Sequence, residues 1–165
     1  MIKSEPVVLA ETFEMVRNLT MMYLNQLDKI DVHEMIDYKG IKFNSAYWIA
    51  GHLTWSEHSL IVNGVAGEDM GIDWIEEFAI GKDPENIVKK PSIEEILKTL
   101  EKVHSKSMEI IKNLSDKNLD EENHFGIAFG GVKSKRNLIK HLIRHEPMHI
   151  GQLSLILKVN GIKFA

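Results

Sequence analysis

The sequence contains no cysteine in its 165 residues, and it has only four prolines. The absence of cysteine excludes disulfide bonds, thiolate zinc sites, iron–sulfur clusters and cysteine nucleophiles. No apolar run approaches the roughly 18 residues that a membrane span requires. Acidic residues outnumber basic residues by 24 to 20, which gives a formal net charge of −4. Because nucleic-acid binding requires a basic face, this balance argues against a nucleic-acid partner.

Histidine is abundant by contrast, with eight in the chain. Without cysteine, histidine is the one strong transition-metal ligand available, helped at most by carboxylates. The length predicts one domain, and the first residues lack the long apolar segment of a signal peptide. We therefore expect a single cytoplasmic domain over residues 1–165, with no membrane association.

Hydrophobic periodicity predicts four long helices, at about 6–30, 45–65, 92–114 and 134–160. Apolar positions in the first helix step by four and three, whereas the second is apolar almost all round. A capping box formed by Ser92 and Glu95 begins the third helix, and the Asn160–Gly161 pair ends the fourth. The sequence therefore predicts an all-α protein, a single four-helix bundle.

Two connections in this bundle are long, at residues 66–91 and 115–133, whereas helix–helix links usually take about 2–8 residues. In the first link, residues 74–78 predict a short helical turn that carries two aromatic side chains. A link of this length can return along a helix of about 30 Å, so that the second and third helices run parallel. Long links also commonly carry binding loops.

The core stripe of the fourth helix becomes polar in its middle, at His145, His149 and Gln152. Buried imidazole and amide groups without partners cost about 1–3 kcal/mol each. Histidines four residues apart on a helix lie about 5–6 Å apart at Cβ, so both can reach one metal ion. The alternative is an ordinary hydrogen-bonded pair of core histidines. The presence of Gln152 on the same stripe favours the metal site.

The best candidate for a third ligand is His52 in the second helix. It follows Gly51, whose missing side chain allows another helix to approach, and it lies between Trp48 and Trp55. Taken alone, His52 is better interpreted as an ordinary core histidine, and the ligand interpretation is favoured only because the fourth helix already provides two histidines. Trp55, Trp74 and Phe78 are expected to wall the pocket. His104 and His141 are weaker candidates, His58 is expected to point elsewhere, and His33 and His124 are interpreted as surface residues.

Residues 145–149 read His-Glu-Pro-Met-His, which matches the H-E-x-x-H motif of zinc proteases. Those enzymes take a third ligand downstream, but no His, Asp, Glu or Cys follows His149. Pro147 also removes a helical hydrogen bond and is expected to kink the helix. We interpret the match as coincidental. Glu146 is expected to support the ligands or to lie on the surface, and a catalytic base is the lesser alternative, so Glu146 and Gln152 are the weak catalytic candidates.

Together, the two histidine segments resemble the DinB-like (DinB/YfiT-type) family. The matching segments are Trp-Ile-Ala-Gly-His-Leu at 48–53 and His-Glu-Pro-Met-His-Ile-Gly-Gln-Leu at 145–153. The resemblance implies a bundle of up-down-down-up topology, often dimeric, that binds a divalent metal ion through His52, His145 and His149. The metal is open among zinc, nickel, iron and manganese. Pro147 departs from the family pattern between the two histidines.

The family includes thiol-dependent S-transferases and a mycothiol-dependent isomerase. The resemblance therefore implies a metal-dependent S-transferase that acts on a small-molecule substrate as a homodimer. Because the chain has no cysteine, the thiol must come from a low-molecular-weight cosubstrate. Two alternatives stay open: a hydrolase that uses metal-bound water, and a non-catalytic binding bundle with a structural metal site.

Overall fold

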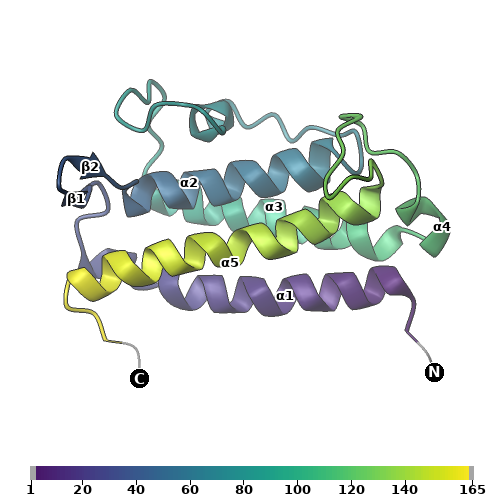
Figure 1. Ribbon diagram of the computed structural model, residues 1–165, viewed down its shortest axis with the longest axis horizontal. Helices are drawn as coiled ribbons and strands as arrows, with labels where there is room; N and C mark the ends of the chain where they lie inside the picture. The colour runs from purple at the N-terminus through teal and green to yellow at the C-terminus, as the bar shows by residue number, and fades with distance from the viewer. Residues whose placement is uncertain (1–2, 164–165) are drawn as a thin grey trace.

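The computed structural model describes residues 3–163 and is helical throughout its main body, which confirms the all-α prediction (Figure 1). A single small hairpin joins the first two long helices. The elements are α1 (Glu5–Leu24), β1 (Asp37–Tyr38), β2 (Ile41–Lys42), α2 (Ala46–Glu57), α3 (Ile93–Asn113), α4 (Asp116–Leu119) and α5 (Lys135–Val159).

Serine side chains begin three of the long helices. Ser45, Ser92 and Ser134 each accept a hydrogen bond from the backbone N–H three residues further on. Such a contact satisfies one of the four N–H groups that lack a partner in the first turn of a helix. The predicted starts of the second, third and fourth helices are therefore confirmed.

The first two helices end earlier than the sequence predicts. α1 stops at Leu24 and gives way to a 3-10 turn, Leu27–Lys29, whereas α2 stops at Glu57 and continues as a π-helical turn, His58–Asn63. Leu27 and Ile61 are nonetheless buried. The apolar spacing correctly predicted that these two residues are buried. It cannot distinguish an α-helix from the tighter 3-10 turn or the wider π-helical turn that extends it.

The long connections carry short elements of their own. Residues 66–91 contain a 3-10 helix at Ile75–Phe78 (η3), which confirms the predicted turn. Figure 1 shows this connection running back along α2 toward the start of that helix before it enters α3. The connection at 115–133 contains α4, and the hairpin before α2 pairs Asp37 with Lys42, neither of which the sequence analysis predicted.

The four long helices pack against one another in pairs: α1 contacts α3 and α5, and α2 contacts the same two helices. Their apolar side chains form two clusters, one that contains Phe13 and Leu142 and one that contains Leu24 and Leu153. Buried polar residues from α1, α2 and α5 occupy the sequence positions between these two clusters. No helix among residues 3–163 is both long and apolar enough to cross a membrane.

Candidate metal centre

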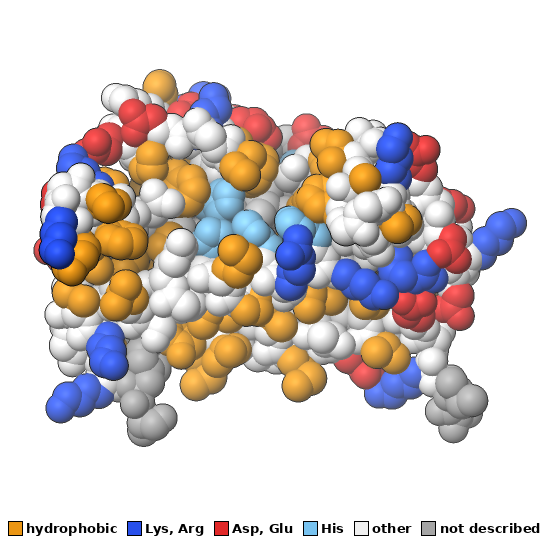
Figure 2. All heavy atoms as spheres, in the orientation of Figure 1, with side chains coloured by type: hydrophobic (Ala, Val, Ile, Leu, Met, Phe, Trp, Pro, Cys, Tyr) orange, Lys and Arg blue, Asp and Glu red, His pale blue; other side chains and the backbone are white. Residues whose placement is uncertain are grey.

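His52 on α2 lies beside His145 and His149 on α5. One ring nitrogen from each histidine lies within 4.8 Å of the others, and the Nε2 atoms of His145 and His149 are 3.1 Å apart. Nitrogen ligands at about 2.0–2.1 Å from a single zinc ion approach one another similarly closely. The structure thus brings together the three predicted histidines. Figure 2 shows histidine side chains in a hollow at the centre of one face, with hydrophobic side chains on both sides.

A backbone carbonyl orients the ring of His52. Its Nδ1 lies 2.8 Å from the carbonyl oxygen of Phe78, which can only accept a hydrogen bond. Nδ1 therefore carries the proton and donates, and Nε2 keeps its lone pair. Metal-ligating histidines commonly donate their second N–H to a carbonyl in this way.

The side chain of Gln152 orients His149 in the same manner. The Nδ1 atom of His149 lies 2.7 Å from Oε1 of Gln152, one turn further along α5. The hydrogen bond fixes the proton on Nδ1 and leaves the Nε2 lone pair directed at the neighbouring histidine. The predicted proximity of Gln152 to the ligands is therefore visible as a direct contact.

Burial keeps the three imidazoles neutral. It lowers the pKa of His52 to about 4 and the pKa of His145 to about 3, with a smaller contribution from His149 in both cases. Burial also lowers the pKa of His149, although Gln152 opposes this effect. Neutral imidazole is the form that binds a metal ion, so the site is in its ligating form at neutral pH.

Aromatic rings cover His52 from two sides. The rings of Trp48 and Trp55 stack on it with centroid distances of 4.6 and 5.4 Å. Phe78 supplies the carbonyl, and its ring fills the space where a Cβ of Gly51 would lie. The expectation that Gly51 admits another helix was wrong, because the element that approaches is the η3 turn of a connection.

Trp74 was predicted to line the pocket with Trp55 and Phe78, but its ring contacts that of Phe78 rather than a histidine, at a centroid distance of 5.6 Å. It belongs to the same buried apolar cluster as Phe78. Trp74 therefore supports Phe78, whose carbonyl orients His52.

Next to the histidines lies a second polar cluster, centred on Arg17 of α1. Its Nε and Nη2 atoms donate to both carboxylate oxygens of Glu146, at 2.9 and 2.8 Å, and Nη2 also donates to Glu57 at 2.7 Å. Thr20 donates to Glu146, and His104 contacts Glu57 with its Nδ1 atom at 3.0 Å. We call these five residues the Arg17 cluster.

The charges of the Arg17 cluster stabilise one another. Burial disfavours the charge of Arg17, but Glu57 and Glu146 outweigh it and hold the pKa of Arg17 above its usual value. Burial likewise raises the pKa of Glu57, and Arg17 with His104 more than reverses that effect. Both carboxylates are completely buried, and both are ion-paired with Arg17.

Glu146 therefore has a structural contact that the sequence analysis did not foresee. It is fully buried rather than on the surface, and its carboxylate faces Arg17 and Thr20. Arg17 and Glu57 were not predicted as functional residues. Two signals pointed to them: Thr20 interrupts the apolar seam of α1, and Glu57 is an acid in a helix that is apolar almost all round.

The remaining histidines lie outside the three-histidine group. His104 contacts Glu57 and Glu14, His58 accepts a hydrogen bond from the N–H of Met70, and His141 stacks on His145 at 5.6 Å. Pro147 is exposed, and α5 continues through it from Lys135 to Val159. The proline therefore does not end the helix between the two histidines.

Comparison with known families agrees with this arrangement. The model of the DinB superfamily matches residues 12–153, which include all three histidines and the Arg17 cluster. The chain belongs to the DinB superfamily. No curated protein matches the sequence.

Membership of the DinB superfamily and the three-histidine group fit one another. The superfamily match covers the segments at 48–53 and 145–153, which carried the resemblance in the sequence. Together they fit a metal-binding DinB-like protein.

Proposed function

We propose that His52, His145 and His149 hold a divalent metal ion and that the protein uses it to activate a small-molecule thiol for S-transfer. The observation that carries the proposal is the set of three neutral imidazoles whose ligand nitrogens lie within 4.8 Å of one another. Two of these rings have Nδ1 fixed by a hydrogen-bond acceptor, which leaves Nε2 for the ion.

A bound divalent ion would supply Lewis-acid chemistry that lowers the pKa of a thiol or a water molecule. Three histidine ligands leave a position for such an exogenous group, whereas a structural zinc site has four protein ligands. Among residues 3–163, the group able to hold a metal contains only the three histidines. This favours an open site over a closed structural one.

The neighbouring residues have distinct roles in this proposal. Gln152 holds the ring of His149, and the carbonyl of Phe78 holds that of His52. Glu146 is occupied by Arg17 and Thr20, so the ion pair argues against a role as a general base. The thiol comes from a cosubstrate, because the chain has no cysteine.

Metal content tests the site directly. Protein prepared in metal-free buffer and reconstituted with Zn²⁺, Ni²⁺, Fe²⁺ or Mn²⁺ should bind one ion per chain, measured by elemental analysis. The substitutions His52→Ala and His149→Ala should each abolish stoichiometric binding. His141→Ala on the same helix is the matched control and should retain it. A wild-type protein without bound metal contradicts the proposal.

A reaction assay then tests the chemistry. The metal-loaded protein is incubated with an electrophilic substrate and each of several low-molecular-weight thiols, and thioether formation is measured. Thioether formation that requires both metal and thiol supports S-transfer. Hydrolysis of the substrate without thiol would instead identify the hydrolase alternative, and inactivity with every thiol would favour a binding role.

We further propose that residues 1–165 form one DinB-like domain, an up-down-down-up four-helix bundle that assembles as a homodimer. The pairing of α1 and α2 with α3 and α5 supports the bundle. Exposed apolar side chains on α1 and α5 support a dimer interface, and sedimentation analysis tests it. The cytoplasmic location expected from the sequence stays a prediction. The exposed apolar residues on the two helices are Val8, Met15, Leu19, Met22, Met148, Leu155 and Val159.

A further inference from the structure

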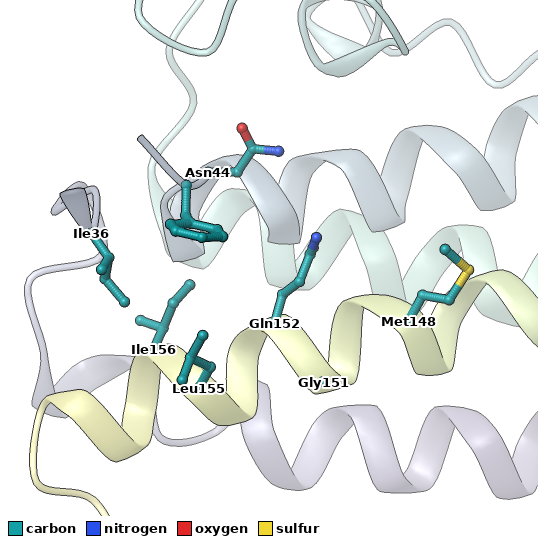
Figure 3. Close-up of a pocket in the computed structure, with 8 residues that line it drawn as sticks. Ile36, Asn44, Met148, Gly151, Gln152, Leu155 and Ile156 are labelled. Atoms are coloured by element: carbon teal, nitrogen blue, oxygen red, sulfur yellow. The ribbon is translucent and has the colours of Figure 1, made fainter. Parts of the chain in front are cut away.

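A cavity of about 240 Å³ lies between α5 and the segment that leads into α2, and Gln152, the residue that contacts His149, is part of its lining. Ile36 and Phe43 line it from that segment, and Leu155 and Ile156 line it from α5 (Figure 3). An apolar cavity of about 150 Å³ is enough to bind benzene. The cavity therefore has room for a group of at least one aromatic ring.

The lining of this cavity carries no charged side chain. Its polar members are the neutral amides of Asn44 and Gln152. Because the lining offers no charged side chain that could pair with an ionic group, it favours a neutral occupant. An apolar group with at most a neutral hydrogen-bonding function matches it.

Gln152 connects the cavity to the histidines. It lines the cavity, and its Oε1 atom accepts a hydrogen bond from Nδ1 of His149 at 2.7 Å. Figure 3 shows its amide extending from α5 toward α2, while Met148, the residue before His149, lines the same cavity. Gln152 therefore separates the cavity from His149 by the length of one side chain.

Gly151 supplies an independent observation. It lies within α5, where glycine is less favourable than alanine by about 1 kcal/mol. A Cβ at this position would meet no atom within 4 Å, so packing within the chain does not require glycine. Gly151 also lines the cavity, and the missing side chain enlarges it.

We propose that this cavity binds the neutral, apolar part of the substrate, a group about one aromatic ring in size, while the reacting end of the same molecule lies at the three histidines. The assignment rests on the proposed function, because it names the substrate class for that site.

The cavity itself is tested without metal, with benzyl alcohol as the probe and benzoate as its charged counterpart. The protein is labelled with ¹³C in the methionine methyl groups. Benzyl alcohol should shift the resonance of Met148, which lines the cavity, and leave that of the exposed Met15 on α1 unchanged. Benzoate should shift Met148 much less. Equal shifts with both probes, or no shift of Met148, would overturn the proposal.

Variants on α5 provide matched controls. Gly151→Leu fills the cavity and Leu155→Asp places a charge in it, so both should abolish the shift of Met148. Val159→Asp introduces the same charge at a similarly exposed position outside the lining and should retain the shift. Loss of the shift in all three variants would attribute it to the helix rather than to the cavity and would overturn the proposal.

The connection to the histidines is tested with zinc-loaded protein and two hydroxamates. Phenylacetohydroxamate should bind about tenfold more tightly than acetohydroxamate, because its ring is buried in the cavity. Gly151→Leu should remove that difference while acetohydroxamate still binds. If the chain takes up no zinc, the proposed function fails. Normal zinc content with equal affinities for the two hydroxamates overturns only the cavity assignment.

Discussion

The three histidines and the Arg17 cluster are neighbouring polar groups in the middle of one core, yet they differ in how their bonding capacity is used. In the Arg17 cluster, Arg17 contacts both Glu57 and Glu146 and each acid accepts at least two hydrogen bonds. At the histidines, Nε2 of His149 lies 3.1 Å from Nε2 of His145 and accepts a hydrogen bond from it, because the proton of His149 is on Nδ1. The two carboxylates of the Arg17 cluster are ion-paired within the chain, although Nη1 of Arg17 is buried without a hydrogen-bond partner among residues 3–163, whereas the three histidines bring ring nitrogens close enough together to hold one metal ion.

The difference arises over a single step along α5. His145 and Glu146 are adjacent in sequence but point in different directions, since successive residues of a helix are about 100° apart. One side chain meets imidazoles from its own helix and from α2, and the other meets a guanidinium from α1. Burial of polar groups alone therefore does not distinguish the two groups, whereas the identity of the side chains that meet does.

The largest expected effect is a loss of stability when the Arg17 cluster is disrupted. Arg17→Met leaves two buried carboxylates without their counter-ion and should reduce the free energy of unfolding by about 3–5 kcal/mol. Urea denaturation measures this change. Lys3→Met, which removes only the exposed pair with Glu11, should change it by less than about 1 kcal/mol. Equal effects of the two substitutions would show that the Arg17 cluster is not a buried ion network.

A smaller effect is expected at the contact between Gly51 and Phe78, which positions the carbonyl that orients His52. Gly51→Ala places a methyl group into the Phe78 ring and should destabilise the protein by about 1–3 kcal/mol. It should also weaken metal binding, because the carbonyl of Phe78 orients His52. Gly151→Ala is the matched control and should stabilise α5 by about 0.5–1 kcal/mol, since its Cβ meets open space. Destabilisation by both substitutions would contradict this interpretation.

The three histidines and the Arg17 cluster should be distinguished most clearly by a variant that changes metal affinity but not the stability of the protein. Gln152→Ala removes the acceptor for Nδ1 of His149 and should weaken metal affinity about 10–100-fold. Competition with a chromogenic chelator measures the affinity. Because Gln152 is exposed, the urea midpoint of the metal-free variant should stay close to that of the wild type. Unchanged metal affinity would remove Gln152 from the site.

A further effect is expected in the pH dependence of the metal-free protein. Burial lowers the pKa of His52 to about 4 and of His145 to about 3, whereas unfolded histidine titrates near about 6.5. Between about pH 6.5 and 4.5 the unfolded chain thus binds more protons, and the free energy of unfolding should decrease as the pH falls. The stabilisation contributed by these neutral histidines should be fully present above about pH 6.5.

Substitution within the site sharpens this test. His145→Gln should make the decrease in unfolding free energy between about pH 6.5 and 4.5 shallower, because one group with a lowered pKa is gone. The carboxylate of Glu57, whose pKa is lowered by Arg17 and His104 against the effect of burial, loses its contribution only below its unfolded pKa of 4.5. An equally steep decrease in His145→Gln would contradict the assignment.

Much of the site was predictable from local sequence. His145, His149 and Gln152 lie on one stripe of a single helix, so their proximity follows from helical periodicity, and the structure shows the His149–Gln152 contact directly. Serine caps likewise fixed the starts of three helices through contacts only three residues long. Such features are local, and the backbone geometry of a helix determines them.

The long-range partners could not be predicted in this way. Arg17 lies 40 residues from Glu57 and 129 residues from Glu146 in the sequence. No local pattern specifies which acid faces which base. The same holds for the contact between His52 and the carbonyl of Phe78, 26 residues away. These contacts depend on the crossing of whole helices and on the path of the long connections.

The sequence by itself determined the helical class, the absence of thiol chemistry within the chain and the placement of two histidines on one face of the last helix. Only the tertiary structure decided that His52 completes the group, that Glu146 turns away to an ion pair, and that a neutral cavity opens beside Gln152. The reason is physical: periodicity assigns a side chain to a face, but only packing decides which partner that face meets.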